Sequence, residues 1–255
     1  MLHSYDWSES SLIVELFTRD AGRVVAAAKG AKRPTSQLRA VLMPFQPVAV
    51  QFARSRGDLG EVRTLRTAEW GGGEATMLQG SDWFSGFYIN ELLLRMLARD
   101  DPQPRLFDAY AATLRSLGHG EARSEAALRA FELLLLRESG VLPDLGRTTP
   151  TQKALSPAGR YVLRSDQGLV EAAAGEAAIA AETCLALASA LERSAGQPPV
   201  DDALQALQGA CARELPALKT LLRSQLHYHL GGAPLRTRQL VLDTQRLLEA
   251  NSPPR

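Results

Sequence analysis

Cysteine is scarce in this 255-residue chain, which has only Cys184 and Cys211. Both lie in segments with a helical pattern, which favours small buried residues over a disulfide. Long apolar runs are absent too, since stretches such as residues 133–136 are far too short to span a membrane. The first residues show neither the basic nor the apolar region of a signal peptide. Together these absences predict a cytoplasmic protein.

The usual sequence signatures of catalysis are also missing. The sequence has no nucleotide-binding glycine loop, no activated nucleophile and no set of four metal ligands. His227 and His229 are two residues apart, so on a helix they point to different sides and are poorly placed to share a metal. We therefore expect no catalytic residue, no metal, no cofactor and no enzyme activity.

Charge is segregated along the chain, although the net charge is only +1. Residues 19–66 contain ten basic and three acidic residues, a net charge of +7, while the rest of the chain carries −6. A basic segment of this kind is typical of contact with a polyanion, and an ordinary solvated surface is the alternative.

The first 72 residues carry the signals of short strands. β-rich segments at 12–18, 23–28, 47–53 and 61–66 are separated by turns that contain glycine, and 36–43 can form a short helix closed by Pro44. Val62 and Leu65 break the alternation of the last segment, which suggests a bulge. About five short strands fit a small closed barrel, so residues 1–72 are predicted to form an OB-fold.

The pattern changes after a break at 70–73, Trp-Gly-Gly-Gly. Residues 73–255 are predicted to form an all-α domain, and the fold class is therefore a multidomain β-plus-α protein. We expect helices at 81–99, 105–117, 124–138, 176–193, 201–231 with an interruption at Pro216, and 237–250. Residues 143–168 follow neither period and are predicted to be an irregular insertion.

Candidate nucleic-acid contacts gather in the basic segment. Lys29, Lys32 and Arg33 should lie on a loop after a strand, where Gly30 allows close backbone approach to phosphates. Tyr5 and Trp7 are the candidate stacking aromatics, whereas the aromatic residues of helix 81–99 are expected to pack between domains. The predicted DNA-binding residues are Arg23, Lys29, Lys32, Arg33, Arg39, Arg54, Arg56 and Arg66.

Two segments read together resemble the RecO family of bacterial recombination-mediator and DNA-repair proteins. They are residues 228–238, Tyr-His-Leu-Gly-Gly-Ala-Pro-Leu-Arg-Thr-Arg, and residues 22–33, which end in Lys-Gly-Ala-Lys-Arg. Shorter matches lie at 42–47, 65–69, 88–93 and 128–133 in the same order. The resemblance implies an OB-fold followed by an α-helical domain. Relatives carry more residues before the first matching Leu-His-Ser, so the first strand is expected to be short.

The resemblance also implies a function and partners. Such a protein would bind single- and double-stranded DNA, anneal complementary strands and work with RecR to help RecA onto strands coated by single-stranded-DNA-binding protein. That coat protein's acidic, apolar-ended tail would dock on the helical domain. The predicted tail-binding residues are Arg129, Leu133, Leu136 and Arg137. Some relatives hold a four-cysteine zinc site in the insertion, but 143–168 has no cysteine, so no zinc is expected.

Three other readings stay open on the residues alone. A helical scaffold whose barrel binds protein would scatter its basic residues around the barrel. An RNA-binding OB-fold protein is not distinguished from a DNA-binding one, because backbone contacts read neither base nor sugar well. An enzyme would need a deep pocket with converging polar groups. Arg236 and Arg238 are expected to brace the last helix more than to touch DNA.

Overall fold

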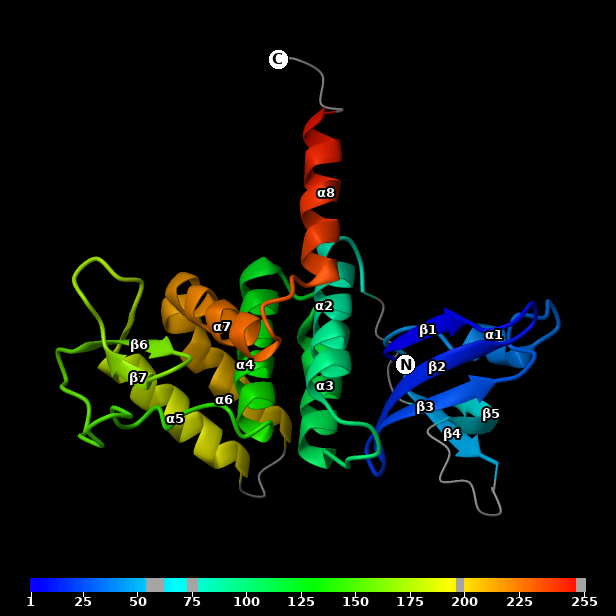
Figure 1. Ribbon diagram of the computed structural model, residues 1–255, viewed down its shortest axis with the longest axis horizontal. Coiled ribbons are helices and arrows are strands. Elements are labelled where there is room, and N and C mark those ends of the chain that lie inside the picture. The colour runs from blue at the N-terminus through cyan, green and yellow to red at the C-terminus, as the bar shows by residue number, and fades with distance from the viewer. Residues whose placement is uncertain (54–61, 73–77, 196–199, 251–255) are drawn as a thin grey trace. The chain divides into compact units, whose positions relative to one another are not determined.

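The computed structural model of the protein describes residues 1–53, 62–72, 78–195 and 200–250 (Figure 1). The chain forms two compact units that are not contiguous in sequence. Unit 1 contains residues 1–79 and 90–107, and unit 2 contains residues 80–89 and 108–255. No helix in the described ranges is both long enough and apolar enough to cross a membrane.

Unit 1 is built on a five-stranded sheet. Its strands are β1 (His3–Asp6), β2 (Leu12–Thr18), β3 (Gly22–Ala28), β4 (Val48–Phe52) and β5 (Arg63–Trp70), in the spatial order β1-β2-β3-β5-β4. All pairs are antiparallel except β3 with β5. The short helix α1 (Gln37–Val41) connects β3 to β4.

The sheet is OB-like but not closed. β1 and β4 are its two edges, and no ladder joins them among the described residues. The expected closed barrel is therefore not formed. β1 has only four residues, all of them paired with β2, so it offers little backbone for a second neighbour. The suspected bulge is confirmed, since the register between β4 and β5 shifts at Gln51 and Phe52.

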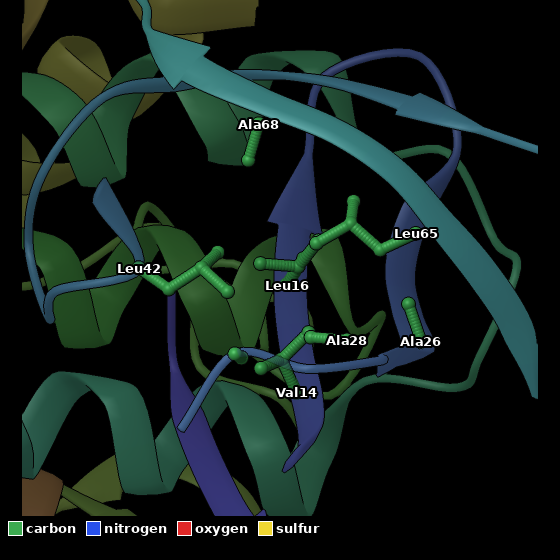
Figure 2. Close-up of a cluster of buried hydrophobic side chains, with 8 residues drawn as sticks. Val14, Leu16, Ala26, Ala28, Leu42, Leu65 and Ala68 are labelled. Atoms are coloured by element: carbon green, nitrogen blue, oxygen red, sulfur yellow. The ribbon is translucent and has the colours of Figure 1, made fainter. Parts of the chain in front are cut away.

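Alternation along the strands separates two faces of the sheet. The inner face carries the core of unit 1, in which side chains from β2, β3 and β5 converge with Leu42 (Figure 2). The labelled members of this core are Val14, Leu16, Ala26, Ala28, Leu42, Leu65 and Ala68. The small side chains of Ala26 and Ala28 on β3 leave room for Leu42 and Leu65 to pack in the same core.

The outer face is covered by residues 90–107. Glu15, Phe17 and Val25 point to this side and are buried. The Asn90 amide donates a hydrogen bond to the Leu2 carbonyl at 2.9 Å, and the Asp100 N–H donates to the Arg23 carbonyl at 2.9 Å. Because these contacts are numerous and buried, the segment after residue 89 belongs to the sheet unit although it is helical.

Unit 2 is helical with a small sheet. Its elements are the first half of α2 (Ser81–Met96), α3 (Pro104–Ser116) from residue 108 onward, α4 (Glu121–Glu138), α5 (Ala181–Ala195), α6 (Val200–Cys211), a 3-10 turn (Ala212–Glu214), α7 (Leu215–His229) and α8 (Arg236–Ala250). Pro216 lies in the first turn of α7, where its missing N–H is tolerated, so the helix restarts there. α7 ends before Gly231 and Gly232, both with positive φ.

The insertion is more ordered than the sequence predicts. A three-stranded sheet, β6 (Arg160–Arg164), β7 (Gly168–Glu171) and β8 (Ile179–Ala180), occupies its second half and continues beyond residue 168. The Gln225 amide of α7 donates to the Leu163 carbonyl at 2.9 Å, which fastens this sheet to the helices. The pattern was missed because each strand has no more than five residues.

Candidate nucleic-acid interface and a cationic cavity

The basic loop, defined as residues 29–33, turns immediately after β3 and is fixed against the β1–β2 turn. Gly30 has a φ of 72°, and its N–H donates to the Ser11 hydroxyl at 3.2 Å. The Lys32 N–H donates to the Ser10 carbonyl at 2.9 Å. The loop is therefore held by its backbone, and its side chains are not needed to maintain its shape.

The three cations of the basic loop differ in their surroundings. Lys29 and Arg33 are exposed. Lys32 is half-buried, and its ammonium lies 3.0 Å from the exposed Asp6 carboxylate and 3.3 Å from the Ser8 carbonyl. An exposed ion pair of this kind contributes little stability, so a phosphate can replace Asp6 at Lys32 at small cost.

Two exposed aromatic rings lie on the segment that holds the basic loop. Tyr5 and Trp7 are 48% and 55% exposed, and the Trp7 N–H donates to the Ser11 carbonyl at 3.2 Å. The Tyr5 ring packs edge-on against His3, with ring centroids 4.5 Å apart. Large exposed rings suit stacking of unpaired bases, and Asp6, which lies between Tyr5 and Trp7 in the sequence, contacts Lys32 of the basic loop.

Arg23 occupies a different environment from the loop. Its guanidinium donates to the Leu94 carbonyl and lies 3.9 Å from Glu15, with a side chain only 14% exposed. Arg99 approaches the same carboxylate at 3.6 Å. The structure thus places Arg23 beneath residues 90–107 in unit 1, away from solvent. A lone glutamate in the apolar strand 12–18 was the sequence signal for this buried charge pair.

Two of the remaining four predicted DNA-binding residues are described by the structure. Arg39 is exposed on α1, and Arg66 is exposed on β5 beside the register shift. Arg54 and Arg56 lie outside the described residues. The structure therefore brings Lys29, Lys32 and Arg33 together in one loop and places Arg23 in a different, largely buried environment.

The four predicted tail-binding residues of α4 do not share a surface either. Leu133 and Leu136 are 0% and 1% exposed and belong to the core of unit 2. Arg137 donates to the Leu191 carbonyl and lies 3.2 Å from the Ser194 hydroxyl, so it ties α4 to α5. Of these four residues, Arg129 alone lines the cavity between α2, α4, α7 and α8. The apolar run on α4 was mistaken for a surface because its pattern does not show which face is covered.

That cavity lies within unit 2 and has a volume of about 360 Å³. Apolar side chains from four helices form much of its wall, including Phe84 of α2, Leu128 of α4, Leu226 of α7 and Val241 of α8. The basic side chains around it are Arg129, Lys219, Arg223, His227 and Arg238, and no described lining residue is acidic. We call this site the cationic cavity.

Arg129 is held by a buried acidic partner. Its terminal nitrogen Nη2 lies 2.6 Å from Oε1 of Glu132, which is fully buried one helical turn further along α4. The Tyr88 hydroxyl donates to the same oxygen at 2.6 Å. Burial raises the pKa of Glu132, while Arg129, the Tyr88 hydrogen bond and Lys219 oppose that shift.

Sequence reasoning missed most of the cationic cavity. Lys219 and Arg223 come from α7, Phe84 and Tyr88 from α2, and Arg238 from α8, so only the tertiary fold brings them together. A local signal did exist for Glu132, because it interrupts a run of apolar residues three positions after Arg129. No group of three potential metal ligands occurs within the described ranges.

Comparison with known proteins matches both halves of the chain to one family. Residues 1–70 match the model for the N-terminal part of recombination protein O, and residues 78–239 match the model for its C-terminal part. The chain is 49% identical to the DNA repair protein RecO of Delftia acidovorans and 48% identical to those of Acidovorax ebreus and Variovorax paradoxus. Each comparison covers 97% of this chain and 95% of the relative.

Proposed function

The chain belongs to the RecO family of DNA repair proteins, and we propose that it acts as a recombination mediator that anneals complementary single strands. The observation that carries this proposal is the basic loop beside Tyr5 and Trp7. Its cations neutralise phosphates and its neighbouring rings can stack on bases, with no need for contacts that read sequence.

Annealing follows from the same chemistry. Two complementary strands repel each other through their phosphates, and a surface of exposed cations reduces this repulsion when it binds either strand. Because the rings contact base faces and leave base edges open, a bound strand can still pair. This mode of action involves no covalent step, so we propose a non-enzymatic role.

We further propose that the cationic cavity receives the acidic, apolar-ended tail of single-stranded-DNA-binding protein. The apolar wall suits the terminal hydrophobic residues, and the surrounding cations suit aspartates and a terminal carboxylate. Docking of this kind would recruit the protein to coated strands, where it works with RecR to help load RecA. Because the proposed substrate is DNA, the bacterial cytoplasm at the nucleoid is the proposed place of action.

Fluorescence anisotropy with a labelled single-stranded oligonucleotide tests the DNA-binding surface. Contact with about five phosphates gives a slope near −3.5 when the logarithm of the binding constant is plotted against the logarithm of salt concentration. Replacing Lys29, Lys32 and Arg33 by alanine should weaken binding and flatten the slope. Replacing the exposed Arg123, Lys153 and Arg193 by alanine removes the same charge elsewhere and is the matched control.

Equal losses in both triple variants would show that only net charge matters, and would contradict a specific role for the basic loop. An annealing assay with two complementary labelled strands then tests the activity itself. The loop variant should anneal slowly and the control at the normal rate. An RNA oligonucleotide of the same sequence measures the preference between DNA and RNA.

A further inference from the structure

The guanidinium of Arg129 is only partly satisfied by its surroundings. The side chain is 9% exposed, so it has lost most of its contact with water. Nη2 contacts Glu132, but the buried Nε has no hydrogen-bond partner among the described residues. Because Arg129 borders the cavity while its Nε is shielded from water, a ligand that accepts hydrogen bonds would contact the terminal N–H groups of the guanidinium.

Glu132 is placed to fix the direction of that guanidinium. Its Oε1 accepts from both Arg129 of α4 and Tyr88 of α2, so one oxygen links two helices that border the cavity. Its Oε2 is buried and has no hydrogen-bond partner among the described residues. Lys219 is the other cation that acts on the pKa of Glu132, and it is paired with Glu125 at a more exposed position.

We propose that Glu132 is the positioning residue of the cationic cavity. It holds Arg129 through Nη2 and thereby directs the other N–H groups of the guanidinium toward the carboxylate of a docked acidic segment. This inference rests on the proposed docking of an acidic tail. It adds that recognition of the carboxylate depends on where one oxygen of Glu132 lies, and not on the negative charge of Glu132.

Two conservative substitutions separate position from charge. Glu132→Gln removes the charge but keeps an oxygen at the same distance from the backbone, able to accept from Tyr88 and Arg129. Glu132→Asp keeps the charge but withdraws the oxygens by one methylene group, about 1.5 Å. A positioning role predicts that glutamine preserves function and aspartate loses it, whereas a role for charge predicts the opposite.

The probe is a fluorescein-labelled peptide with three aspartates followed by two apolar residues at a free carboxyl terminus. A second peptide is identical except for an amidated terminus. The ratio of their dissociation constants measures recognition of the terminal carboxylate, and we expect the unchanged protein to favour the free acid by on the order of tenfold. Glu132→Gln should keep most of this preference, and Glu132→Asp should reduce it to about twofold or less.

Two further variants guard against trivial effects. Tyr88→Phe removes only the hydroxyl that donates to Glu132, and should reduce the preference less than Glu132→Asp does. Glu121→Gln, on the exposed first turn of the same helix, makes the same charge change away from the cavity and should change nothing. Circular dichroism melting establishes that each variant is folded, and Tyr88→Phe with Glu132→Gln still test the proposal if Glu132→Asp does not fold.

The outcomes distinguish this inference from the docking on which it rests. Loss of preference in folded Glu132→Gln, or its retention in folded Glu132→Asp, would overturn the positioning role while leaving docking intact. If the unchanged protein binds neither peptide, both the docking and the positioning role are overturned. Preference kept by glutamine and lost by aspartate supports both.

Discussion

The basic loop and the cationic cavity both rely on basic side chains, but those of the loop are mostly exposed and the key arginine of the cavity is buried. Lys29 and Arg33 stand exposed on a loop whose shape is fixed by its backbone, so they are able to follow a phosphate chain of variable geometry. Arg129 is buried and held by Glu132, so it can serve only a ligand that reaches it in one orientation. Exposed cations therefore favour DNA binding that does not depend on base sequence and weakens with added salt. A buried cation favours recognition of one chemical group.

The largest expected effect concerns Leu133, which was predicted to bind a peptide tail but lies in the core of unit 2. Leu133→Ala should lower the free energy of unfolding by about 3 kcal/mol, because it removes a fully buried side chain and leaves a cavity. Urea unfolding followed by circular dichroism measures the loss. Leu242→Ala, at an exposed position on α8, is the matched control and should cost less than about 0.5 kcal/mol. Similar small losses in both would contradict the core position of Leu133.

A second test asks whether every arginine of the basic segment serves DNA. Arg23→Met should lower the free energy of unfolding by about 2 kcal/mol, since Glu15 and the Leu94 carbonyl lose their buried partner. DNA affinity, measured by anisotropy on the folded variant, should change by less than about twofold because one distant charge matters little at physiological salt. A large loss of DNA affinity with unchanged stability would show that Arg23 reaches the nucleic acid.

A third test uses pH to examine the buried acid of the cavity. Because burial raises the pKa of Glu132 in the folded protein, folding favours its protonated form. Its contribution to the free energy of unfolding is then fully present below the ordinary carboxyl pKa and is lost as pH rises through the raised value. Urea unfolding across this range should show that loss, and Glu132→Gln should remove it. An unchanged pH profile in Glu132→Gln would contradict the raised pKa.

The smallest expected effect is that of Lys29 alone on the salt dependence of DNA binding. Lys29→Ala should make the slope of log binding constant against log salt concentration less steep by about 0.7, the contribution of one phosphate contact on a single strand. Arg123→Ala is the single-residue control and should leave the slope unchanged. A salt series of anisotropy titrations measures both, and an unaltered slope in Lys29→Ala would remove this residue from the interface.

The local pattern of the sequence predicted much of the fold. β2 has the predicted bounds, because a run rich in apolar and β-branched residues before a glycine turn specifies a strand locally. The restart of the helix at Pro216 and its end before Gly231 also follow from local chemistry. The open sheet was missed because a short segment does not show which distant strands pair, and β6 was missed because it and its partners have no more than five residues each.

The candidate site residues likewise include some that local sequence predicted and others that it did not. The basic loop was predicted because its cations are neighbours in sequence, and Arg129 because it lies in a matching segment. Lys219 and Tyr88 were not, since their relation to Arg129 depends on how α2, α4 and α7 pack. Glu132 was missed although it lies three residues after Arg129 on the same helix, because the sequence does not show that both side chains are buried there. Arg23 and Leu133 show the opposite error: each was predicted to bind a ligand because of its residue type, but each side chain lies largely away from solvent in the structure.

Helix α2 has a practical consequence for dividing the protein. The borders between the two compact units fall at residues 79/80, 89/90 and 107/108, so the second half of this helix belongs with the sheet of unit 1. A fragment that stops at residue 72 would retain every strand of the large sheet yet expose Phe17 and Val25 to water. Such a fragment should aggregate, and the smallest piece able to keep this sheet covered must extend to residue 107.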